Sequence, residues 1–198
     1  MRTTSEAIKA YAEALPEGAT LSAKELLHLG ERAAIDQALS RLVKRGELIR
    51  VRRGVFALPV QTRFGKRAPS VEAVVENLAK STGERISISG ASAANMLGLS
   101  TQNPARHIYW TSGPSRHLKL GAQNVELKHV PSWQLRAPNS KAGHAFRALA
   151  YFGKEEAGLA LGRLKPQLTK DERRELFSLR ASAPTWMAKE LSALANAQ

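Results

Sequence analysis

The sequence contains no cysteine, and its 198 residues include only two aspartates, Asp36 and Asp171. Without cysteine, the chain can form neither a disulfide framework nor a metal site built on thiolates. A hydrolase that holds metal ions among carboxylates would need several of them near its other ligands, and two aspartates contribute little to such a cluster. We therefore expect no metal site, no cofactor and no catalytic residue.

Short motifs that mark common catalytic sites are also missing. No glycine is followed by Lys-Ser or Lys-Thr at the spacing of a phosphate-binding loop, and no Gly-x-Ser-x-Gly segment is present. Histidines 107, 117, 129 and 144 are the strongest candidates for a metal or general-base site, and the first three fall on predicted strands. Glu126 is the only carboxylate in that strand region, so the histidines do not predict an enzyme.

Long apolar segments are absent as well. No run approaches the ~18–20 residues that cross a bilayer, and no N-terminal stretch has the pattern of a secretory signal. From these two absences we expect a cytoplasmic protein without a membrane partner.

The sequence is rich in positive charge. The chain has thirty Lys and Arg residues and seventeen Asp and Glu residues, which gives a net charge of +13. Residues 1–60 have ten basic and seven acidic side chains, and residues 61–198 have twenty basic and ten acidic ones. Such an excess predicts a polyanionic partner, although charge alone does not separate DNA from RNA or an acidic membrane surface.

Residues 21–58 have the pattern of a helix-turn-helix that follows a supporting helix at 4–15. Ser22 with Glu25 forms the sequence of a capping box, which predicts a short helix at about 22–28 that ends near Gly30. A second helix is predicted from Glu31. One apolar face of that helix collects residues at three- and four-residue spacing: Ile35, Ala38, Leu39, Leu42 and Val43.

Two β-prone runs follow the second helix, at 48–51 and 55–58. They flank Arg52-Arg53-Gly54, where glycine suits the positive φ of a tight hairpin turn. Two helices joined by a turn, then a basic hairpin, is the order of parts in a winged helix. This order favours double-stranded DNA as the polyanion.

Eight residues are predicted to contact DNA. Arg32 and Gln37 lie early in the second helix and suit the base edges of guanine and adenine. Phosphate contacts are expected from Ser40, Arg41 and Lys44. On the wing, Arg50, Arg52 and Arg53 can follow the backbone or enter the minor groove. The alternative is a small helical packing module with a solvated charged face. Against it, nine basic residues lie between 41 and 67, where Glu47 is the only acid.

Residues 61–69 lack periodicity and are expected to form a basic linker, either along DNA or simply in solvent. Beyond it, residues 70–198 predict a mixed domain, so the chain divides into 1–60, 61–69 and 70–198 and has an α+β fold. Helices are predicted at 70–83 and 92–97, a strand at 86–89, an antiparallel meander at 107–111, 116–120 and 124–130, and helices at about 140–152, 154–164, 169–181 and 185–196. The loop at 111–116, TSGPSR, either holds an anionic group or only connects strands.

Several segments carry a family likeness: LVKRGELIRVRRGVFALP (42–59), ISISGASAANMLGLS (86–100), IYWTSGPSRHLKLG (108–121) and VELKHVP (125–131). Together they resemble the AbiEi-like antitoxins of type IV toxin–antitoxin systems. The resemblance implies that the N-terminal domain represses its own promoter by binding inverted repeats, and that the C-terminal domain counters a nucleotidyltransferase toxin. It assigns DNA contact to Arg32, Gln37, Arg41, Lys44, Arg52 and Arg53, and no catalytic residue.

A second hypothesis stands beside the antitoxin. The chain can be a winged-helix regulator or nucleic-acid-binding protein with no toxin partner, whose basic second domain adds non-specific affinity. Under the first hypothesis that domain engages the toxin's acidic surface, nucleotide or tRNA substrate. Either protein binds DNA as a monomer or a dimer, and a neighbouring gene for a nucleotidyltransferase distinguishes the two.

Overall fold

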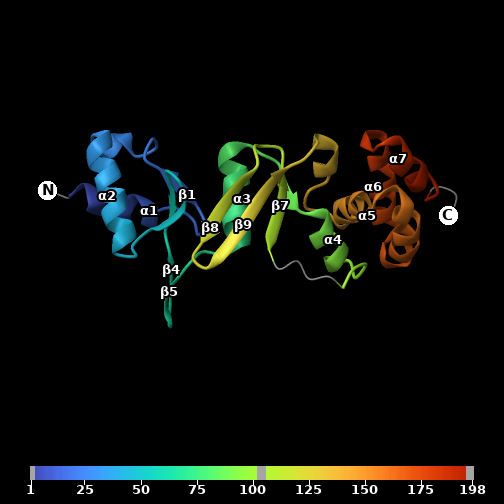
Figure 1. The fold of residues 1–198 in the computed structure, drawn as a ribbon, viewed down its shortest axis with the longest axis horizontal. Coiled ribbons are helices and arrows are strands. Elements are labelled where there is room, and N and C mark those ends of the chain that lie inside the picture. The colour runs from blue at the N-terminus through green and yellow to red at the C-terminus, as the bar shows by residue number, and fades with distance from the viewer. Residues whose placement is uncertain (1–2, 102–105, 195–198) are drawn as a thin grey trace. The chain divides into compact units, whose positions relative to one another are not determined.

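The computed structural model describes residues 3–101 and 106–194 and has the mixed α+β fold predicted from the sequence (Figure 1). Its α-helices are α1 (Thr4–Glu13), α2 (Arg32–Lys44), α3 (Val71–Thr82), α4 (Gly90–Met96), α5 (Lys141–Leu164), α6 (Lys170–Ser178) and α7 (Thr185–Ser192). No helix in these residues is both long enough and apolar enough to cross a membrane.

Short strands form three small sheets in the described residues. The strands are β1 (Thr20–Ser22), β2 (Ile49–Arg52), β3 (Val55–Ala57), β4 (Val60–Thr62), β5 (Gly65–Arg67), β6 (Ile86–Ile88), β7 (His107–Thr111), β8 (Arg116–Leu120) and β9 (Gln123–His129). The sheet orders are β1-β3-β2, β4-β5 and β6-β7-β9-β8.

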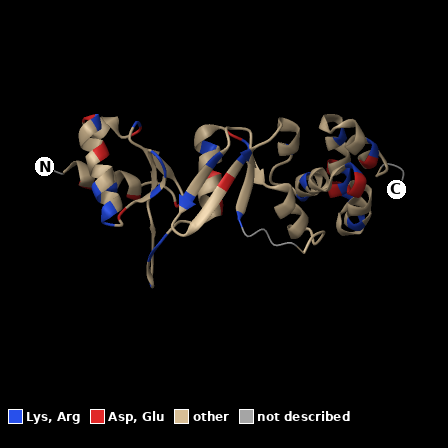
Figure 2. Cartoon of the chain, in the orientation of Figure 1, with Lys and Arg blue, Asp and Glu red and all other residues tan. Residues whose placement is uncertain are grey.

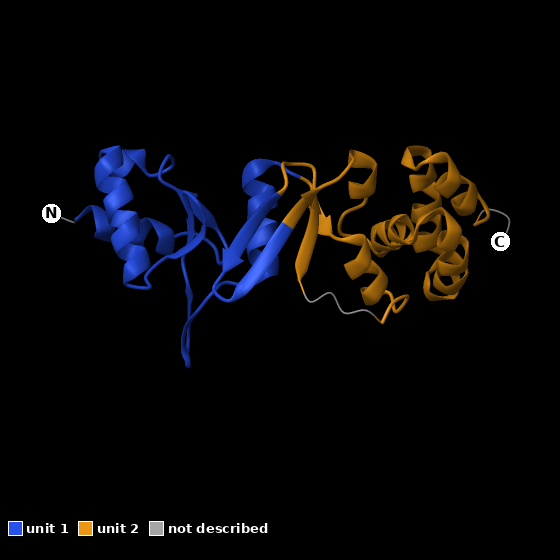
Figure 3. Ribbon diagram, in the orientation of Figure 1, with its two compact units in different colours: residues 1–84, 116–126 blue, residues 85–115, 127–198 orange. Residues whose placement is uncertain are grey.

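The chain divides into two compact units, coloured separately in Figure 3. Unit 1 comprises the described residues of 1–84 and 116–126, and unit 2 those of 85–115 and 127–198. Unit 1 therefore extends past residue 60 and takes in β4, β5, α3 and β8. A cut anywhere in 61–69 would divide one compact unit.

The N-terminal part of unit 1 has the element order of a winged helix. Helix α1 leads through β1 and a 3₁₀ helix at Leu27–Leu29 to α2, and the β2–β3 hairpin follows. Strand β3 pairs antiparallel with β1 on one side and β2 on the other. The apolar face of α2 predicted from the sequence is buried, and its side chains share a core with those of α1: Ile8, Ala12, Ile35, Ala38, Leu39 and Leu42.

The prediction of a helix at 22–28 is wrong. Ser22 lies in β1, opposite Val55, so its backbone is extended. The Glu25 carboxylate accepts a hydrogen bond from the Ser22 N–H at 2.7 Å, as a capping box requires. However, the Glu25 N–H donates to the Ser22 carbonyl at 3.1 Å, which makes a turn. Of the predicted helix only Ser22 lies in the strand, residues 23–26 form turns, and a 3₁₀ helix at Leu27–Leu29 precedes Gly30.

Most of the segment expected to be a linker is a β-hairpin. Strands β4 and β5 pair antiparallel, with Thr62 opposite Gly65. The Thr62 hydroxyl donates to the Gly65 carbonyl at 2.8 Å and accepts from the Phe64 N–H at 3.2 Å. Each strand has only three residues, too few to show an alternating pattern in the sequence. Helix α3 then begins at its predicted Ser70 cap and ends at Gly83, whose φ is 70°.

The four-stranded sheet is not the meander expected from the sequence. Strand β9 lies between β7 and β8, so β7 and β8 are not neighbours although they are consecutive in the chain. Within unit 1, the edge strand β8 lies beside β2 of the winged helix. This contact joins segments more than sixty residues apart, and local sequence patterns do not encode it.

Unit 2 has a helical core in which α4 packs against α5 through small side chains, among them Gly90 and Ala93. The chain breaks its helical conformation at Gly153, with φ 73°, between the two helices predicted there. Thr169 and Glu172 form the predicted capping box at α6. Helix α6 ends at Ser178 and gives way to a 3₁₀ helix, and the last residues of the helix predicted at 185–196 lie outside the described residues.

Arg147 is a fully buried arginine in unit 2. Its guanidinium donates to the carbonyls of Arg136 at 3.2 Å and Pro138 at 2.8 Å, and no carboxylate in the described residues pairs with it. Burial lowers the Arg147 pKa to about 10, so the group is charged at neutral pH. Burial and the Arg147 charge also lower the pKa of the half-buried His144. Arg147 thus links residues 136–138 to α5 by hydrogen bonds.

Gly90 provides the first testable prediction. A Cβ at this position would lie 2.7 Å from the Arg147 carbonyl oxygen, the Trp110 ring and the Tyr151 Cβ. We therefore expect Gly90→Ala to destabilise unit 2 by about 1–3 kcal/mol, since overpacking forces the helices apart. Denaturant unfolding followed by circular dichroism measures the change.

Gly162→Ala is the matched control. This glycine is exposed within α5, and a Cβ there meets no atom within 4 Å. Alanine should leave stability unchanged or raise it by about 0.5–1 kcal/mol through helix propensity. Equal stability of the Gly90→Ala variant and the wild type would show that α4 and α5 are less tightly packed than described.

Candidate nucleic-acid interface

The exposed face of α2 displays the side chains predicted to reach DNA. Burial of Ile35 and Leu39 on the opposite face fixes the rotation of the helix about its axis. As a result, the predicted contacts of α2 point to solvent or its margin: Arg32, Gln37, Arg41 and Lys44 are exposed, and Ser40 is partly exposed. This face is mainly cationic towards the C-terminal end of the helix.

Arg32 already has a partner on its own helix. Its Nε lies 2.9 Å from the Asp36 carboxylate one turn along, and the two side chains are 62% and 53% exposed. An ion pair this open to water is weak. Arg32 can therefore exchange Asp36 for a base or a phosphate at little cost.

The wing is the turn between β2 and β3. Arg52 and Arg53 are exposed there, and Gly54 has the positive φ, 73°, expected from the sequence. The pairing of β2 with β3 shifts register between Arg50 and Arg52, around the buried Val51. Arg50 lies with its guanidinium 5.5 Å from the centre of the Phe56 ring. Side chains of β2 thus alternate between a buried valine and outward arginines.

Figure 2 shows Lys and Arg in blue on α2 and on the strands that follow it. All eight residues predicted to contact DNA lie in unit 1, on α2, β2 and the β2–β3 turn. The fold therefore brings them to one helix and to the hairpin that follows it, within one compact unit.

Glu47, the only acid between residues 41 and 67, is neutralised locally. Its carboxylate lies 2.6 Å from Arg45 Nε and 3.1 Å from Lys9 Nζ. The hydrogen bond from Lys9, together with the charges of Arg45 and Lys9, lowers the Glu47 pKa below its usual value. Glu47 therefore serves to join α1 to the end of α2 rather than to repel a phosphate.

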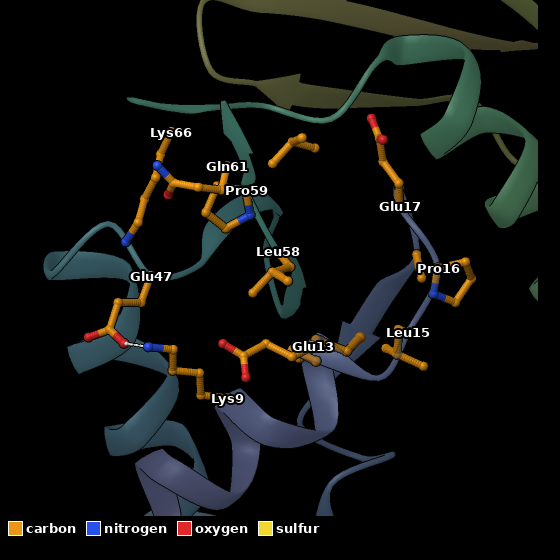
Figure 4. A pocket seen from close by; sticks show the side chains of 15 residues that line it. Lys9, Glu13, Leu15, Pro16, Glu17, Glu47, Leu58, Pro59, Gln61 and Lys66 are labelled. Carbon is orange, nitrogen blue, oxygen red and sulfur yellow. Dashed lines mark ion pairs between the residues drawn. The ribbon is translucent and has the colours of Figure 1, made fainter. Parts of the chain in front are cut away.

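A cavity of about 510 Å³ lies in unit 1 beside this ion pair (Figure 4). The end of α1 and the chain entering β4 form much of its wall, with Leu15, Leu58 and Pro59 among its apolar residues. Its charged residues are Lys9, Glu13, Glu17, Glu47 and Lys66. Lys66 Nζ donates to the Gly46 carbonyl at 3.3 Å, and Glu17 pairs with Arg67 at 3.5 Å. These bonds attach the base of the β4–β5 hairpin to the winged helix.

The histidines and the 111–116 loop give no reactive cluster. In the described residues, no group of three or more His, Asp or Glu side chains is placed to hold a metal ion. His129 Nδ1 lies 2.9 Å from the Gly113 carbonyl. The backbone N–H of His129 donates to the Ser115 hydroxyl at 2.9 Å. The Gly113 N–H donates to the Thr111 hydroxyl at 3.0 Å. These hydrogen bonds join residues 111–115 to one another and to His129, all in unit 2.

The β4–β5 hairpin was not predicted, because residues 61–69 were expected to be a linker along DNA or in solvent. Its turn carries Arg63 and Phe64, both exposed. The glycine at 65, between aromatic and basic residues, was the one signal for a turn there.

The chain is similar to one protein family and to one solved structure. The sequence model of the family described as "Family of unknown function (DUF6088)" matches residues 7–176. The crystal structure of RV2827C protein from Mycobacterium tuberculosis is similar over 98% of this chain and 78% of that one, with 17% identity and a TM-score of 0.51. At this identity the similarity concerns the fold alone. No curated protein matches the sequence.

Glu47→Gln should destabilise unit 1 in a pH-dependent manner. Because the folded state lowers the Glu47 pKa from 4.5, its ion pairs stabilise the protein above about pH 4.5. That stabilisation is lost as the pH falls through the lower, folded value. Thermal unfolding should therefore show a lower midpoint for Glu47→Gln at pH 7 and a shrinking difference on acidification below pH 4.5. A constant difference across this range would mean that the carboxylate charge is not what joins α1 to α2.

Proposed function

We propose that this chain, which belongs to the DUF6088 family, is a sequence-specific DNA-binding protein that represses its own promoter and acts as the antitoxin to a nucleotidyltransferase toxin. The observation that carries the DNA-binding part is the outward, cationic face of α2 followed directly by an arginine-tipped wing. Two elements of this kind fit the major groove and the adjacent backbone of a duplex.

Helix α2 is the element proposed to enter the major groove. Its thirteen residues span about 20 Å, and its N-terminal half carries Arg32 and Gln37. These two side chains read base edges, once Arg32 has left Asp36. Ser40, Arg41 and Lys44 lie further along and bind phosphates, which sets the register of the helix on the duplex.

The wing contributes affinity rather than discrimination. Arg52 and Arg53 extend from a turn that a glycine at positive φ keeps tight. Guanidinium groups on such a tip follow the phosphate backbone or enter a narrow minor groove. Arg50 lies on β2 near the Phe56 ring and adds a further positive charge beside the duplex.

The antitoxin part rests on the resemblance of residues 86–100, 108–121 and 125–131 to AbiEi-like antitoxins. In that proposal the positively charged remainder of the chain meets the acidic surface, nucleotide or tRNA substrate of the toxin. Because unit 1 includes residues 116–126, the two activities are best separated by point variants of the full chain.

Removal of the two wing arginines should weaken DNA binding and reduce its salt dependence. The Arg52→Ala/Arg53→Ala variant loses two phosphate contacts, so the slope of log K against log salt should become shallower by about 1.8, at about 0.9 per contact. Fluorescence anisotropy with a duplex of the protein's own promoter measures the slope. Lys154→Ala/Lys189→Ala removes the same charge from exposed positions of unit 2 and is the control.

Gln37→Ala is the matched comparison for base reading. It should lower the preference for the promoter over random duplex by about 1–3 kcal/mol while leaving the salt slope intact. If the wing variant and the Lys154/Lys189 control change the slope equally, the positive charge acts diffusely and the wing has no special role. A wild-type chain with no preference for its promoter would contradict the repressor proposal.

Growth rescue tests the antitoxin part. When a nucleotidyltransferase encoded next to this gene is induced from an independent promoter, co-expression of the full chain should restore growth. The Arg52→Ala/Arg53→Ala variant should rescue equally well, since DNA binding and neutralisation are proposed to use different surfaces. Failure of both chains, at matched protein levels, would remove the antitoxin part and leave the DNA-binding part standing.

A further inference from the structure

The turn of the β4–β5 hairpin presents an aromatic ring almost fully to solvent. Phe64 is 87% exposed, the highest exposure among the large apolar side chains of the described residues. Single exposed apolar side chains are common on protein surfaces, so the exposure of Phe64 points to a contact only together with the order and the charge of the turn that carries it.

The turn holds Phe64 in a defined position. The Thr62 hydroxyl bonds to both the Gly65 carbonyl and the Phe64 N–H, at 2.8 and 3.2 Å. Gly65 has φ 108°, a conformation that other residues rarely adopt. These features close the turn from within, so that the ring is presented without an additional loss of backbone freedom on binding.

The base of the hairpin is attached to the same unit that carries α2. Lys66 donates to the Gly46 carbonyl, directly after α2, and Arg67 pairs with Glu17. In Figure 1 the hairpin extends away from the winged helix, with its turn outermost. Lys66 and Arg67 of β5 thus attach the base of the hairpin to the winged helix, whereas the turn residues are exposed.

The chemistry of the turn fits a nucleic acid. The Arg63 guanidinium lies 4.7 Å from the centre of the Phe64 ring. The cation covers one face of the ring in the unbound chain and can leave it for a phosphate. The apolar ring is the kind of side chain that unstacks a base step from the minor groove. The turn also lies in a sequence, RFGKR, without an acid to repel phosphates.

We infer that the β4–β5 turn is a third DNA-contacting element, in which Phe64 inserts at a base step beside the site bound by α2 while Arg63 pairs with a phosphate. This inference rests on the proposed function, because it requires that unit 1 bind duplex DNA. It extends that function from reading sequence to deforming the duplex, and the deformability of the inserted step then contributes to specificity.

The test uses the full chain and its own promoter duplex, with 2-aminopurine placed at successive positions to report unstacking. Phe64→Ala should weaken binding by about 5- to 150-fold and abolish the fluorescence increase that the wild type produces at one step. Phe64→Tyr, which keeps the ring, should retain both properties within about twofold. Leu159→Ala removes another large apolar side chain, 73% exposed in unit 2, and should change neither.

The outcomes separate the two proposals. If wild type and Phe64→Ala bind the promoter equally and give the same fluorescence, the insertion is wrong and the DNA-binding function stands. If the wild type does not bind duplex DNA, both proposals are wrong. If Phe64→Ala instead converts a free dimer into a monomer in sedimentation analysis, the ring joins two copies of the chain and the insertion is overturned.

Discussion

Burial of one face of α2 is the constraint on which the proposed interface depends. Ile35, Leu39 and Leu42 are almost fully buried, and each contributes about 1.5–3 kcal/mol by leaving water. The helix cannot rotate about its axis without exposing them. The cations of the opposite face are therefore presented outward by the packing of the core, because an ion pair as exposed as that of Arg32 with Asp36 is too weak to set the rotation of the helix. The same core includes α1, which Glu47 links to the end of α2. Sequence changes that loosen this core would therefore alter the proposed interface without touching a residue that belongs to it.

The elements that sequence predicted well are those whose cause is local. The apolar spacing in α2, the glycine at the 52–54 turn, the Gly153 break and the Thr169 capping box each involve residues within a few positions of one another. Prediction failed where pairing with distant residues decides the outcome. Ser22 is a strand residue because it pairs with Val55, and β8 is an edge strand that lies beside β2. Three-residue strands are too short to reveal such pairings by their own pattern.

The candidate interface was predictable to a similar degree. Exposure of the residues proposed to contact DNA follows from the amphipathic pattern of α2 and the turn of the hairpin, both of which are visible in the sequence. The Arg32–Asp36 pair was visible too, at a spacing of four residues on one helix. The contact of Lys9 with Glu47 was not, because it joins separate elements. The position of Phe64 was not predicted for another reason. Residues 61–69 were expected to be a linker, and a linker gives no fixed place to a side chain.

The buried Arg147 gives unit 2 an unusual response to acid. A buried cation that is paired with a carboxylate loses this partner when acid protonates the carboxylate. The partners of Arg147 are the backbone carbonyls of Arg136 and Pro138, which do not titrate. Acid sensitivity near this charge comes instead from His144, whose pKa is lowered in the folded state. A base with a depressed pKa favours the unfolded chain as the pH falls below its ordinary value, near 6.5. Burial and the Arg147 charge disfavour a second positive charge in the folded chain, so mild acidification lowers the stability of unit 2 through protonation of this imidazole in the unfolded chain.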